Sequence, residues 1–455
     1  MSFLTVIIFC ATIFCVQSVT YNINSSTTNW QTILSNLKAG DIVTIHHGTY
    51  VTPGFFQLTL NGTLNNPIII QGAPNETRPI IQGPVAGANA QNVINIQGSN
   101  FMVKGIAFTK GSRGVRLGPA VTSNAIFDNI YIFNTTGTAF SANDNANEYV
   151  NITLKNSEIT NTNALAATTS ECVYVGCVSD ECRIRDSLFQ HNYCHDTLGS
   201  VGGSRAGFQI KPGSYNVIIR NNVCYNVVGP CIIVYDDYDH GRNLIDGNLA
   251  INAGTADIGI QCTSGATITN NIVINSNLAG IGVIVNSLYP NVSYTRNITI
   301  NQNTVYMSQA DACLRLNSVT NKNITILNNV FYCGNQPSIK ASNDLTGARI
   351  YNNATNGSIS ATGISSCGTF AISSNAFLNA AATNFYPASS SLLINKGVNL
   401  RYQAFYDYNG MPRSIVTPTV GAYEYSTTNN PGCPVINNFK CASSTASVPQ
   451  YPLTP

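Results

Sequence analysis

One pattern limits the possible folds of this sequence more than any other: a short apolar strand, an asparagine turn and a second short strand recur through the chain. The strands alternate apolar and polar residues, and no amphipathic helical pattern separates them. A recurrence of some two dozen residues with several short strands predicts a solenoid in which each repeat forms one coil of parallel strands. The recurring asparagine occupies seven positions: Asn192, Asn222, Asn248, Asn271, Asn303, Asn329 and Asn353.

Asparagine suits two demands of such a turn. It tolerates a left-handed backbone better than other residues that have a side chain, so we expect it at the tightest point of each corner. Amides stacked at the roughly 4.8 Å spacing of parallel strands can also hydrogen-bond from coil to coil. Ser157 and Ile130 occupy the matching place in two earlier coils, so the polar ladder is expected to begin only at Asn192.

The chain is expected to have three parts. Residues 1–18 contain a short apolar run followed by small residues, which predicts a signal peptide. Residues 19–425 form a single β-helix domain, and residues 426–455 form a C-terminal tail with a small disulfide loop. A helical apolar face that begins at Trp30 predicts an N-terminal helix, which would cap the open end of the solenoid.

Charge, hydropathy and sequons indicate which partners the protein binds and in which compartment it works. Charged residues make up 9% of the chain and the net charge is +2, which argues against nucleic acid as a partner. Residues 19–455 contain no apolar run long enough to span a membrane, and N-x-S/T sequons are frequent, so we expect a secreted, extracellular glycoprotein. A capped solenoid is most simply a monomer.

Cysteine usage points the same way. Of the 14 cysteines, those that follow the signal peptide are even in number and suit disulfides in an oxidising compartment, with buried free thiols as the alternative. Their spacing lacks the paired C-x-x-C pattern of structural zinc sites. We expect disulfide-stabilised corner loops, with these pairs: Cys224–Cys231, Cys313–Cys333 and Cys433–Cys441.

Several motifs together resemble a known superfamily. AGDIVTIHHGTY near the N-terminus, the asparagine coils, and LLINKG, DYNGMPR and VGAYEY near the C-terminus resemble the secreted right-handed parallel β-helix proteins of the pectate-lyase-like superfamily. The resemblance covers nearly all of residues 21–425 and implies an all-β, right-handed parallel β-helix. It implies function only broadly, because the superfamily includes polysaccharide lyases, glycosidases, epimerases and adhesins.

In such a fold, outward residues of successive coils form one surface row. The amides, tyrosines and cations of this row can bind the hydroxyls, ring faces and acidic groups of an extended acidic polysaccharide, although an ordinary solvated sheet face is the alternative. We predict that six of them bind substrate: Tyr174, Gln209, Tyr235, Gln261, Asn286 and Arg315. The others in the row are Arg116, Asn143, Lys211 and Lys340.

Charge gathers on the turns that leave three neighbouring coils, at 171–177, 207–212 and 230–237. Lys211 is predicted to be the base of a β-elimination, with Arg205 or Arg242 lowering its pKa and pairing with a substrate carboxylate. His240 is a further catalytic candidate, against the alternative of a turn histidine without a role.

The acids of the same turn suggest a metal. Asp236, Asp237 and Asp239 offer the hard oxygen ligands that Ca²⁺ prefers, although their order differs from that of an EF-hand loop. Turn capping or surface solvation explains each acid equally well.

Two functions follow from these residues. The first is a secreted enzyme that acts like a polysaccharide lyase, because Lys211 resembles the base of β-helical lyases, in which calcium or a basic residue neutralises the uronate. Polygalacturonase-like hydrolases carry Asp-Asp and His-Gly pairs on different coils. Here Asp236-Asp237 and His240-Gly241 share one turn, which argues against that chemistry. The second is a non-catalytic matrix, cell-wall or adhesive protein that binds polysaccharide through the same groove.

Overall fold

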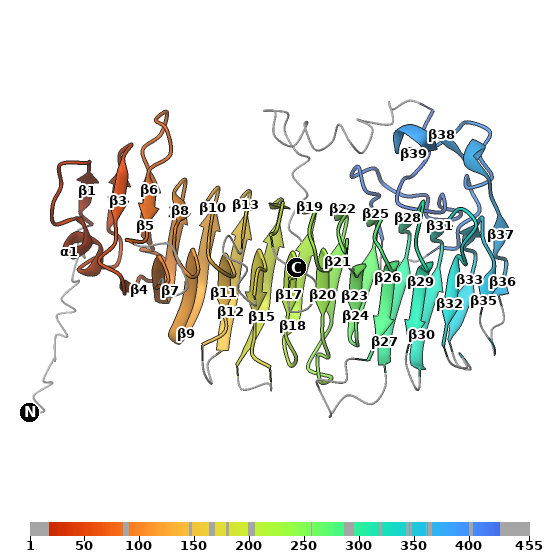
Figure 1. The fold of residues 1–455 in the computed structure, drawn as a ribbon, viewed down its shortest axis with the longest axis horizontal. Helices are drawn as coiled ribbons and strands as arrows, with labels where there is room; N and C mark the ends of the chain where they lie inside the picture. Colours follow the sequence, from red (N-terminus) through yellow and green to blue (C-terminus); the bar gives the residue numbers. More distant parts are fainter. Residues whose placement is uncertain are drawn as a thin grey trace, which may run out of the picture.

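The fold is an elongated row of coils made almost entirely of parallel strands (Figure 1). It is known from a computed structural model, which describes residues 18–84, 91–144, 148–162, 169–178, 182–198, 205–255, 257–285, 295–317, 321–342, 345, 348–360, 362, 366–399 and 404–427. In most coils the chain passes through three short strands, and each strand pairs in parallel with its counterpart in the next coil. This arrangement is a parallel β-helix, as the repeat predicts.

The strands form three stacks along the solenoid, of which the first two are joined into one sheet by the long strands β7 and β9. The first stack contains β4 (Gln57–Asn61), β7 (Ile94–Lys104), β9 (Val115–Asp128), β11 (Phe140–Ala142), β14 (Val173–Val175), β17 (Phe208–Ile210), β20 (Ile232–Val234), β23 (Ile258–Cys262), β26 (Ala279–Ile284), β29 (Ala312–Asn317), β32 (Ile339–Ala341) and β35 (Ile359–Ser360).

The second stack shares β7 and β9 with the first. Its other members are β1 (Thr20–Ile23), β2 (Ile42–Ile45), β5 (Ile68–Gly72), β12 (Glu148–Lys155), β15 (Arg183–Gln190), β18 (Tyr215–Arg220), β21 (Asn243–Asp246), β24 (Ala266–Thr269), β27 (Thr295–Asn301), β30 (Asn321–Leu327), β33 (Arg349–Tyr351) and β36 (Ser366–Cys367).

The third stack is a separate sheet. It contains β3 (Thr49–Val51), β6 (Ile80–Gln82), β8 (Ala107–Thr109), β10 (Tyr131–Phe133), β13 (Glu158–Thr160), β16 (Tyr193–His195), β19 (Val223–Tyr225), β22 (Leu249–Ile251), β25 (Ile272–Ile274), β28 (Thr304–Tyr306), β31 (Val330–Tyr332), β34 (Ala354–Thr355) and β37 (Phe370–Ala371).

The asparagine ladder runs along the corner between the second and third stacks, as the sequence predicts. The side chain of Asn222 donates from Nδ2 to Asn248 Oδ1 at 3.0 Å and to the Phe189 carbonyl of the preceding coil at 2.9 Å. The same Asn248 oxygen accepts from the backbone N–H of Asn222 at 3.0 Å. This pattern continues without a break from Asn192 to Asn353, and every member is buried.

Two details of the corner differ from the prediction. The polar ladder begins one coil earlier than Asn192, at Ser157, because the Ser157 N–H donates to Asn192 Oδ1 at 3.1 Å and its hydroxyl oxygen accepts from the Ile130 N–H at 3.1 Å. The expectation that the ladder asparagine itself is left-handed is wrong. The residue directly before it has the positive φ, as at Asn221 (52°) and Asn270 (56°). The left-handed turn is therefore made by the first residue of each pair, and the amide hydrogen bonds between coils are made by the second.

The interior is filled by the inward side chains of all three stacks. Aromatic residues stack from coil to coil, with the Phe127 ring 6.0 Å from Phe101 and 5.1 Å from Phe140, both edge to face. The helix α1 (Trp30–Ser35) lies at the N-terminal end, where Trp30 packs edge-on against Tyr50 and Phe56 (Figure 1). The helix is present as expected, and its capping function stays a prediction.

Beyond the coils, the chain folds back over the third stack (Figure 1). This C-terminal segment, residues 374–427, includes two 3₁₀ turns, η1 (Ser374–Ala376) and η2 (Ala380–Ala382), and an antiparallel pair, β38 (Phe377–Asn379) and β39 (Asn384–Pro387). Its apolar side chains cover the outer faces of several strands of the third stack. The motifs LLINKG, DYNGMPR and VGAYEY all lie in it.

Within the part of the chain that the structure describes, four disulfides join cysteines on or next to adjacent strands: Cys172–Cys194, Cys177–Cys182, Cys224–Cys231 and Cys313–Cys333. Two of the predicted pairs are thereby confirmed, and Cys433–Cys441 lies outside the described residues. The expectation that the other cysteines are also paired is wrong for Cys262 and Cys367, which are free. Cys262 points into the core, where its partners in register are Val234 and Val283, so no thiol is within reach there.

The disulfides fit a secreted or extracellular protein. Across the described residues, we find no helix with the length and apolar character needed to cross a membrane. Signal peptide, glycosylation and monomeric state stay predictions. The sequon at Asn353 is part of the buried ladder, so this asparagine cannot carry a glycan in the folded protein.

Removing one ladder amide tests how much the ladder stabilises the solenoid. Asn271→Ala deletes an oxygen that accepts two hydrogen bonds from Asn248 and leaves Asn303 Oδ1 without one donor. Because unpaired buried polar groups are costly, we expect a loss of about 3 kcal/mol of unfolding free energy. Urea denaturation of the disulfide-intact protein measures it.

The matched control is Asn151→Gly. Asn151 is exposed, has a φ of 54° that glycine adopts freely, and donates one side-chain hydrogen bond to Asn124. We expect a loss of less than about 1 kcal/mol. Equal losses in the two variants would show that the buried ladder does not stabilise the fold.

Candidate functional site

The candidate site lies where β14, β17 and β20 pair side by side in the first stack, as predicted. The register aligns Tyr174 with Gln209 and Gln209 with Ile233. Lys211 and Tyr235 each follow the aligned residue by two positions, at the ends of neighbouring strands. Strand alternation therefore brings an amine, an amide and two phenol rings to one place on the outward side of the sheet.

Lys211 is the central group of this site. Its side chain is buried, with 4% of the residue exposed, and its Nζ lies 4.8 Å from the centre of the Tyr174 ring and 4.9 Å from that of Tyr235. Two aromatic faces at this distance attract a cation. The amine is thus enclosed by the two rings rather than extended into solvent.

A hydrogen-bond chain connects Lys211 to a buried acid. In the amide orientation that satisfies both neighbours, Gln209 Oε1 accepts from Lys211 Nζ at 3.0 Å and Nε2 donates to Glu171 Oε1 at 2.9 Å. The other carboxyl oxygen of Glu171 accepts from the Thr138 hydroxyl at 2.6 Å. Glu171, Gln209 and Thr138 are all buried, so this hydrogen-bond chain lies away from solvent.

Burial changes the protonation of both end groups. It lowers the pKa of Lys211 to about 8, and the nearby Glu171 carboxylate opposes part of this shift. It raises the pKa of Glu171 to about 7, against the hydrogen bond from Thr138. Near neutral pH the chain therefore contains an amine that can lose its proton and an acid that can gain one.

In the acidic turn that follows β20, an arginine side chain pairs with two of the three acids that were predicted to bind a metal. Arg296, on β27, binds Asp236 with two hydrogen bonds of 2.8 and 2.9 Å and Asp239 with one of 2.9 Å. Asp237 is buried and packs against Gly265, and its burial beside Asp236 raises its pKa to about 6. Asp236 and Asp239 thus neutralise an arginine two coils further on.

This arrangement does not favour a calcium site. Both carboxylate oxygens of Asp236 already accept from Arg296, and the described residues contain no group of three histidine, cysteine or acidic residues placed to bind a metal. The calcium hypothesis stays untested, and no step of the chemistry below uses a metal.

The other predicted catalytic residues differ in their burial. Arg205 is buried just before β17. Arg242 is exposed at the corner before β21, and His240 is exposed beside Arg183, with Nε2 3.1 Å from Arg183 Nη1. The structure gives burial, and not Arg205 or Arg242, as the largest cause of the lowered pKa of Lys211.

The rest of the row continues in register along the first stack. Gln261 is aligned with Ile233 and Gly282, and Arg315 is aligned with Gly282 and Lys340. Towards the N-terminal end of the stack, Arg116 is aligned with Ser141, and Ser141 with Tyr174. Asn143 follows Ser141 by two residues, as Lys211 follows Gln209 and Tyr235 follows Ile233. Asn286 lies outside the described residues.

Glu171 and Thr138 are the site residues that sequence reasoning missed. Each lies two residues before a strand of the first stack. The alternation of apolar and polar residues along the strands does not extend to these positions, so it predicts only ordinary turn residues there. Glu171 could have been predicted as a site residue, because it is an acid in a chain with few charges and it lies one coil before Lys211. Arg113, half-buried near Glu171 and Tyr174, is a further cation of this region.

The role of Glu171 can be measured through the titration of Lys211. Glu171→Gln keeps the size of the side chain and removes the negative charge that opposes the burial effect, so we expect the pKa of Lys211 to fall further below about 8. NMR titration of ¹³C-labelled lysines measures this pKa, and Lys211→Met identifies the signal by removing it. An unchanged or higher pKa in Glu171→Gln would contradict the proposed coupling.

Comparison with known proteins supports the fold. No protein-family profile matches the sequence, and no curated protein matches it. The pectate lyase Pel9A is similar in structure, with 15% identity and a TM-score of 0.53 over 90% of this chain and 97% of that one. The A-module of mannuronan C-5 epimerase AlgE6 from Azotobacter vinelandii gives 15% identity and a TM-score of 0.52 over 73% and 90% of the two chains.

The PL6 family alginate lyase AlyGC is also similar, with 14% identity and a TM-score of 0.51 over 90% of this chain and 60% of that one. At such identities the similarity concerns the fold and not the chemistry. Together with the three stacks of parallel strands, it shows that this chain has the right-handed parallel β-helix fold.

Proposed function

We propose that this protein acts on acidic extracellular polysaccharide as a lyase-like enzyme that uses Lys211 as its base. The observation that carries the proposal is the buried amine, with a pKa of about 8, between two tyrosine rings in an outward row of sugar-binding residue types. The similar structures named above include a pectate lyase and an alginate lyase, whose substrates are acidic polysaccharides.

The reaction would proceed by β-elimination. Neutral Lys211 takes the proton from the carbon next to the uronate carboxylate, and the electrons of that C–H bond form a carbon–carbon double bond. The adjacent glycosidic C–O bond breaks, and the leaving oxygen receives a proton. The products are a shortened chain and a new end that carries an unsaturated uronate, and Lys211 returns to its neutral form when its proton passes to solvent.

The chain of Thr138, Glu171 and Gln209 would position the base. Gln209 fixes Nζ through its carbonyl oxygen, while Glu171 fixes the Gln209 amide. Because a near-neutral pKa keeps a useful fraction of Lys211 unprotonated, burial supplies the basicity that free lysine lacks. Tyr174 and Tyr235 would cover the faces of the bound sugar.

The substrate carboxylate needs a positive partner for proton removal to be favourable. Arg205, which is buried and precedes β17, and Arg242, which is exposed, are the cations proposed for this role. Gln261 and Arg315 would bind sugar units further along the row. Arg242 and His240 are exposed near the acidic turn, where they are candidates for contact with the outer part of the substrate.

A non-catalytic glycan-binding protein is the second candidate. One observation favours it: Lys211 is hydrogen-bonded and sandwiched by two rings, as a purely structural lysine would be. Such a protein would use the same row of tyrosines, amides and cations to bind polysaccharide without cleaving it.

The test is an assay for unsaturated uronate by absorbance with pectate, alginate and glycosaminoglycans, with and without calcium. For the wild-type protein we expect product from at least one of these, at a rate that rises with pH through about 8 as Lys211 loses its proton. Lys211→Met should lower the rate at least a thousandfold while binding changes little.

A matched control is Lys340→Met, which changes a half-buried lysine of the same row that pairs with Asp311. It should keep most of the rate. Binding of an acidic polysaccharide with no product under any condition would favour the non-catalytic candidate, and an active Lys211→Met protein would exclude Lys211 as the base.

A further inference from the structure

The Lys211 amine is covered in this structure, although its proposed role as a base requires contact with substrate. Lys211 is 4% exposed, and its Nζ lies between the rings of Tyr174 and Tyr235. Removal of a proton needs the sugar carbon roughly 3–3.5 Å from the amine nitrogen. A sugar carbon therefore reaches Nζ only if part of this cover moves.

Tyr235 is the ring of this cover whose surroundings can change. Tyr174 lies in the middle of β14, which pairs with β11 on one side and β17 on the other, so its backbone is fixed by two neighbouring coils. Tyr235 instead follows the last residue of β20 and leads directly into the acidic turn. Its side chain is buried in one cluster with Ala206, Ile233 and Tyr238. The position of the Tyr235 ring thus depends on where the turn places Tyr238.

Tyr238 has a backbone conformation that bulky residues avoid. Its φ is 51°, and the φ of Asp239 is 60°, so two residues in succession are left-handed. This conformation costs free energy for residues with a Cβ atom, and it persists only where the surroundings hold it. Here Asp236 Oδ1 accepts from the Tyr238 N–H at 2.8 Å, and Asp237 Oδ1 accepts from the Asp239 N–H at 3.2 Å. The turn is therefore a strained segment that acidic side chains restrain.

Arg296 completes this restraint, and we call the cluster of Asp236, Arg296 and Asp239 the latch. Its two ion pairs differ in burial. The side chain of Asp236 is 1% exposed and accepts two hydrogen bonds from Arg296, whereas that of Asp239 is 60% exposed and accepts one. Exposed ion pairs are weak and are screened by salt, and buried pairs are screened much less. The latch can therefore open at Asp239 while Arg296 stays bound to Asp236.

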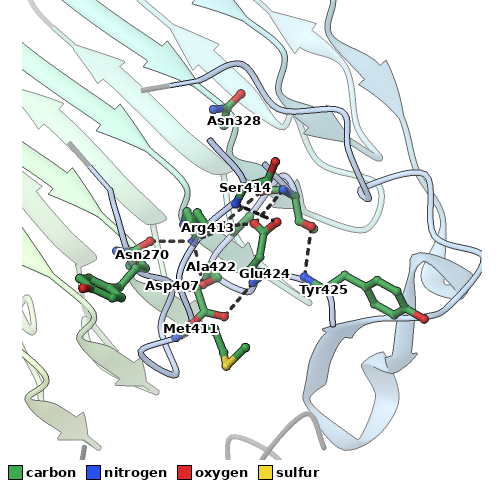
Figure 2. Close-up of polar contacts among 12 residues, drawn as sticks. Asn270, Asn328, Asp407, Met411, Arg413, Ser414, Ala422, Glu424 and Tyr425 are labelled. Atoms are coloured by element: carbon green, nitrogen blue, oxygen red, sulfur yellow. Dashed lines mark hydrogen bonds and ion pairs between the residues drawn. The ribbon is translucent and has the colours of Figure 1, made fainter. Parts of the chain in front are cut away.

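Another arginine–acid cluster, in the C-terminal segment, shows how a permanent restraint differs (Figure 2). Arg413 donates to Asn270 Oδ1 at 2.7 Å and pairs with Glu424 at 3.5 Å. Arg413 and Glu424 are both buried, so salt has little access to their ion pair. This cluster holds the C-terminal segment to the solenoid at a fixed place. The latch differs because one of its acids faces solvent.

We propose that Tyr238 and the latch control access to the Lys211 amine. With the latch closed, the turn holds Tyr238 against Tyr235, and Tyr235 covers Nζ. When the pair of Arg296 and Asp239 opens, the turn relaxes to an ordinary backbone and Tyr238 leaves the cluster. The Tyr235 ring then tilts away from Nζ, and a sugar enters on the outer side of the tyrosine pair. Tyr238 is thus a positioning residue that acts on the amine through Tyr235.

This inference rests on the proposed function, because control of access matters only if Lys211 meets a substrate. Access itself can be measured without any substrate. The experiment is acetylation of the full, disulfide-intact chain with N-hydroxysuccinimidyl acetate, followed by peptide mass spectrometry. Only the neutral amine reacts, so the rate at each lysine is divided by its neutral fraction from NMR titration.

Tyr238→Gly tests the role of the ring. Glycine adopts a φ of 51° without strain, so this variant keeps the shape of the turn and removes the side chain that packs against Tyr235. In the wild type we expect Lys211 to react roughly tenfold more slowly than Lys340, a half-buried lysine of the same row. In Tyr238→Gly we expect the Lys211 rate to rise roughly fivefold and the Lys340 rate to stay unchanged.

Asp239→Asn tests the latch. Asparagine tolerates the φ of 60° and removes the charge that pairs with Arg296. We expect Lys211 to react roughly threefold faster in this variant than in the wild type at low salt. Raising the NaCl concentration from about 0.05 M to about 0.5 M should speed the wild-type reaction roughly twofold, because salt screens the exposed pair. The Asp239→Asn rate should not respond to salt.

Two controls separate opening of the latch from loss of fold. Tyr225→Ala removes an exposed ring on the third stack and should leave the Lys211 rate unchanged. Cys262 is a free thiol that is fully buried on β23, in the coil that follows β20. Iodoacetamide should leave Cys262 unreacted in every variant, since the core stays closed when only the turn moves.

Four results would overturn the proposal. They are equal rates at Lys211 and Lys340 in the wild type, an unchanged Lys211 rate in Tyr238→Gly, a wild-type salt response in Asp239→Asn, and alkylation of Cys262 alongside faster acetylation. A faster Lys211 rate in Tyr238→Gly without cleavage of any polysaccharide would support the latch and contradict only the proposed reaction. Cleavage with an unchanged Lys211 rate would contradict only the latch.

Discussion

The hydrogen bonding between successive coils is the interaction on which the rest of the structure depends. Backbone pairing aligns each strand with its counterpart in the next coil, and the buried asparagine ladder repeats that alignment with side chains at one corner. A slip of one residue would turn inward side chains outward and would separate the amides, so the ladder also fixes the register. Because each ladder amide contacts the coils before and after it, the cost of breaking it is shared by neighbouring coils.

That register creates the candidate site. Thr138, Glu171 and Gln209 come from three successive coils, and the contacts of Glu171 with the other two span 33 and 38 residues in sequence. None of these contacts is local, so the position of the Lys211 amine depends on coil length as much as on residue type.

The sequence predicts the periodic features well. The asparagine ladder from Asn192 to Asn353 and the alignment of Tyr174 with Gln209 both follow from repeat spacing and alternation. The sequence does not show which residue of an Asn-Asn pair carries the positive φ, because both are asparagine and the choice depends on which side chain the core can bury. The structure assigns the turn to Asn221 and the buried amide to Asn222.

Contacts between distant coils are harder to predict. The pairing of Arg296 with Asp236 joins residues 60 apart, so it depends on the summed lengths of two coils. From the sequence alone, the acids at 236–239 resemble metal ligands. The arginine that pairs with two of them lies two coils away, and the sequence does not show that it reaches them. The hydrogen bond of Arg413 to Asn270 is equally hidden, because it forms only when the C-terminal segment folds back onto the solenoid.

The most direct test of the account is a crystal structure of the Lys211→Met protein with a bound uronate oligosaccharide. The account predicts a sugar chain along the first stack, with one sugar ring packed against the tyrosine pair from the outer side and its acidic carbon roughly 3–3.5 Å from the space left by the Lys211 amine. An oligosaccharide bound on another face of the solenoid, or one held in this row with its acidic carbon turned away from position 211, would contradict it.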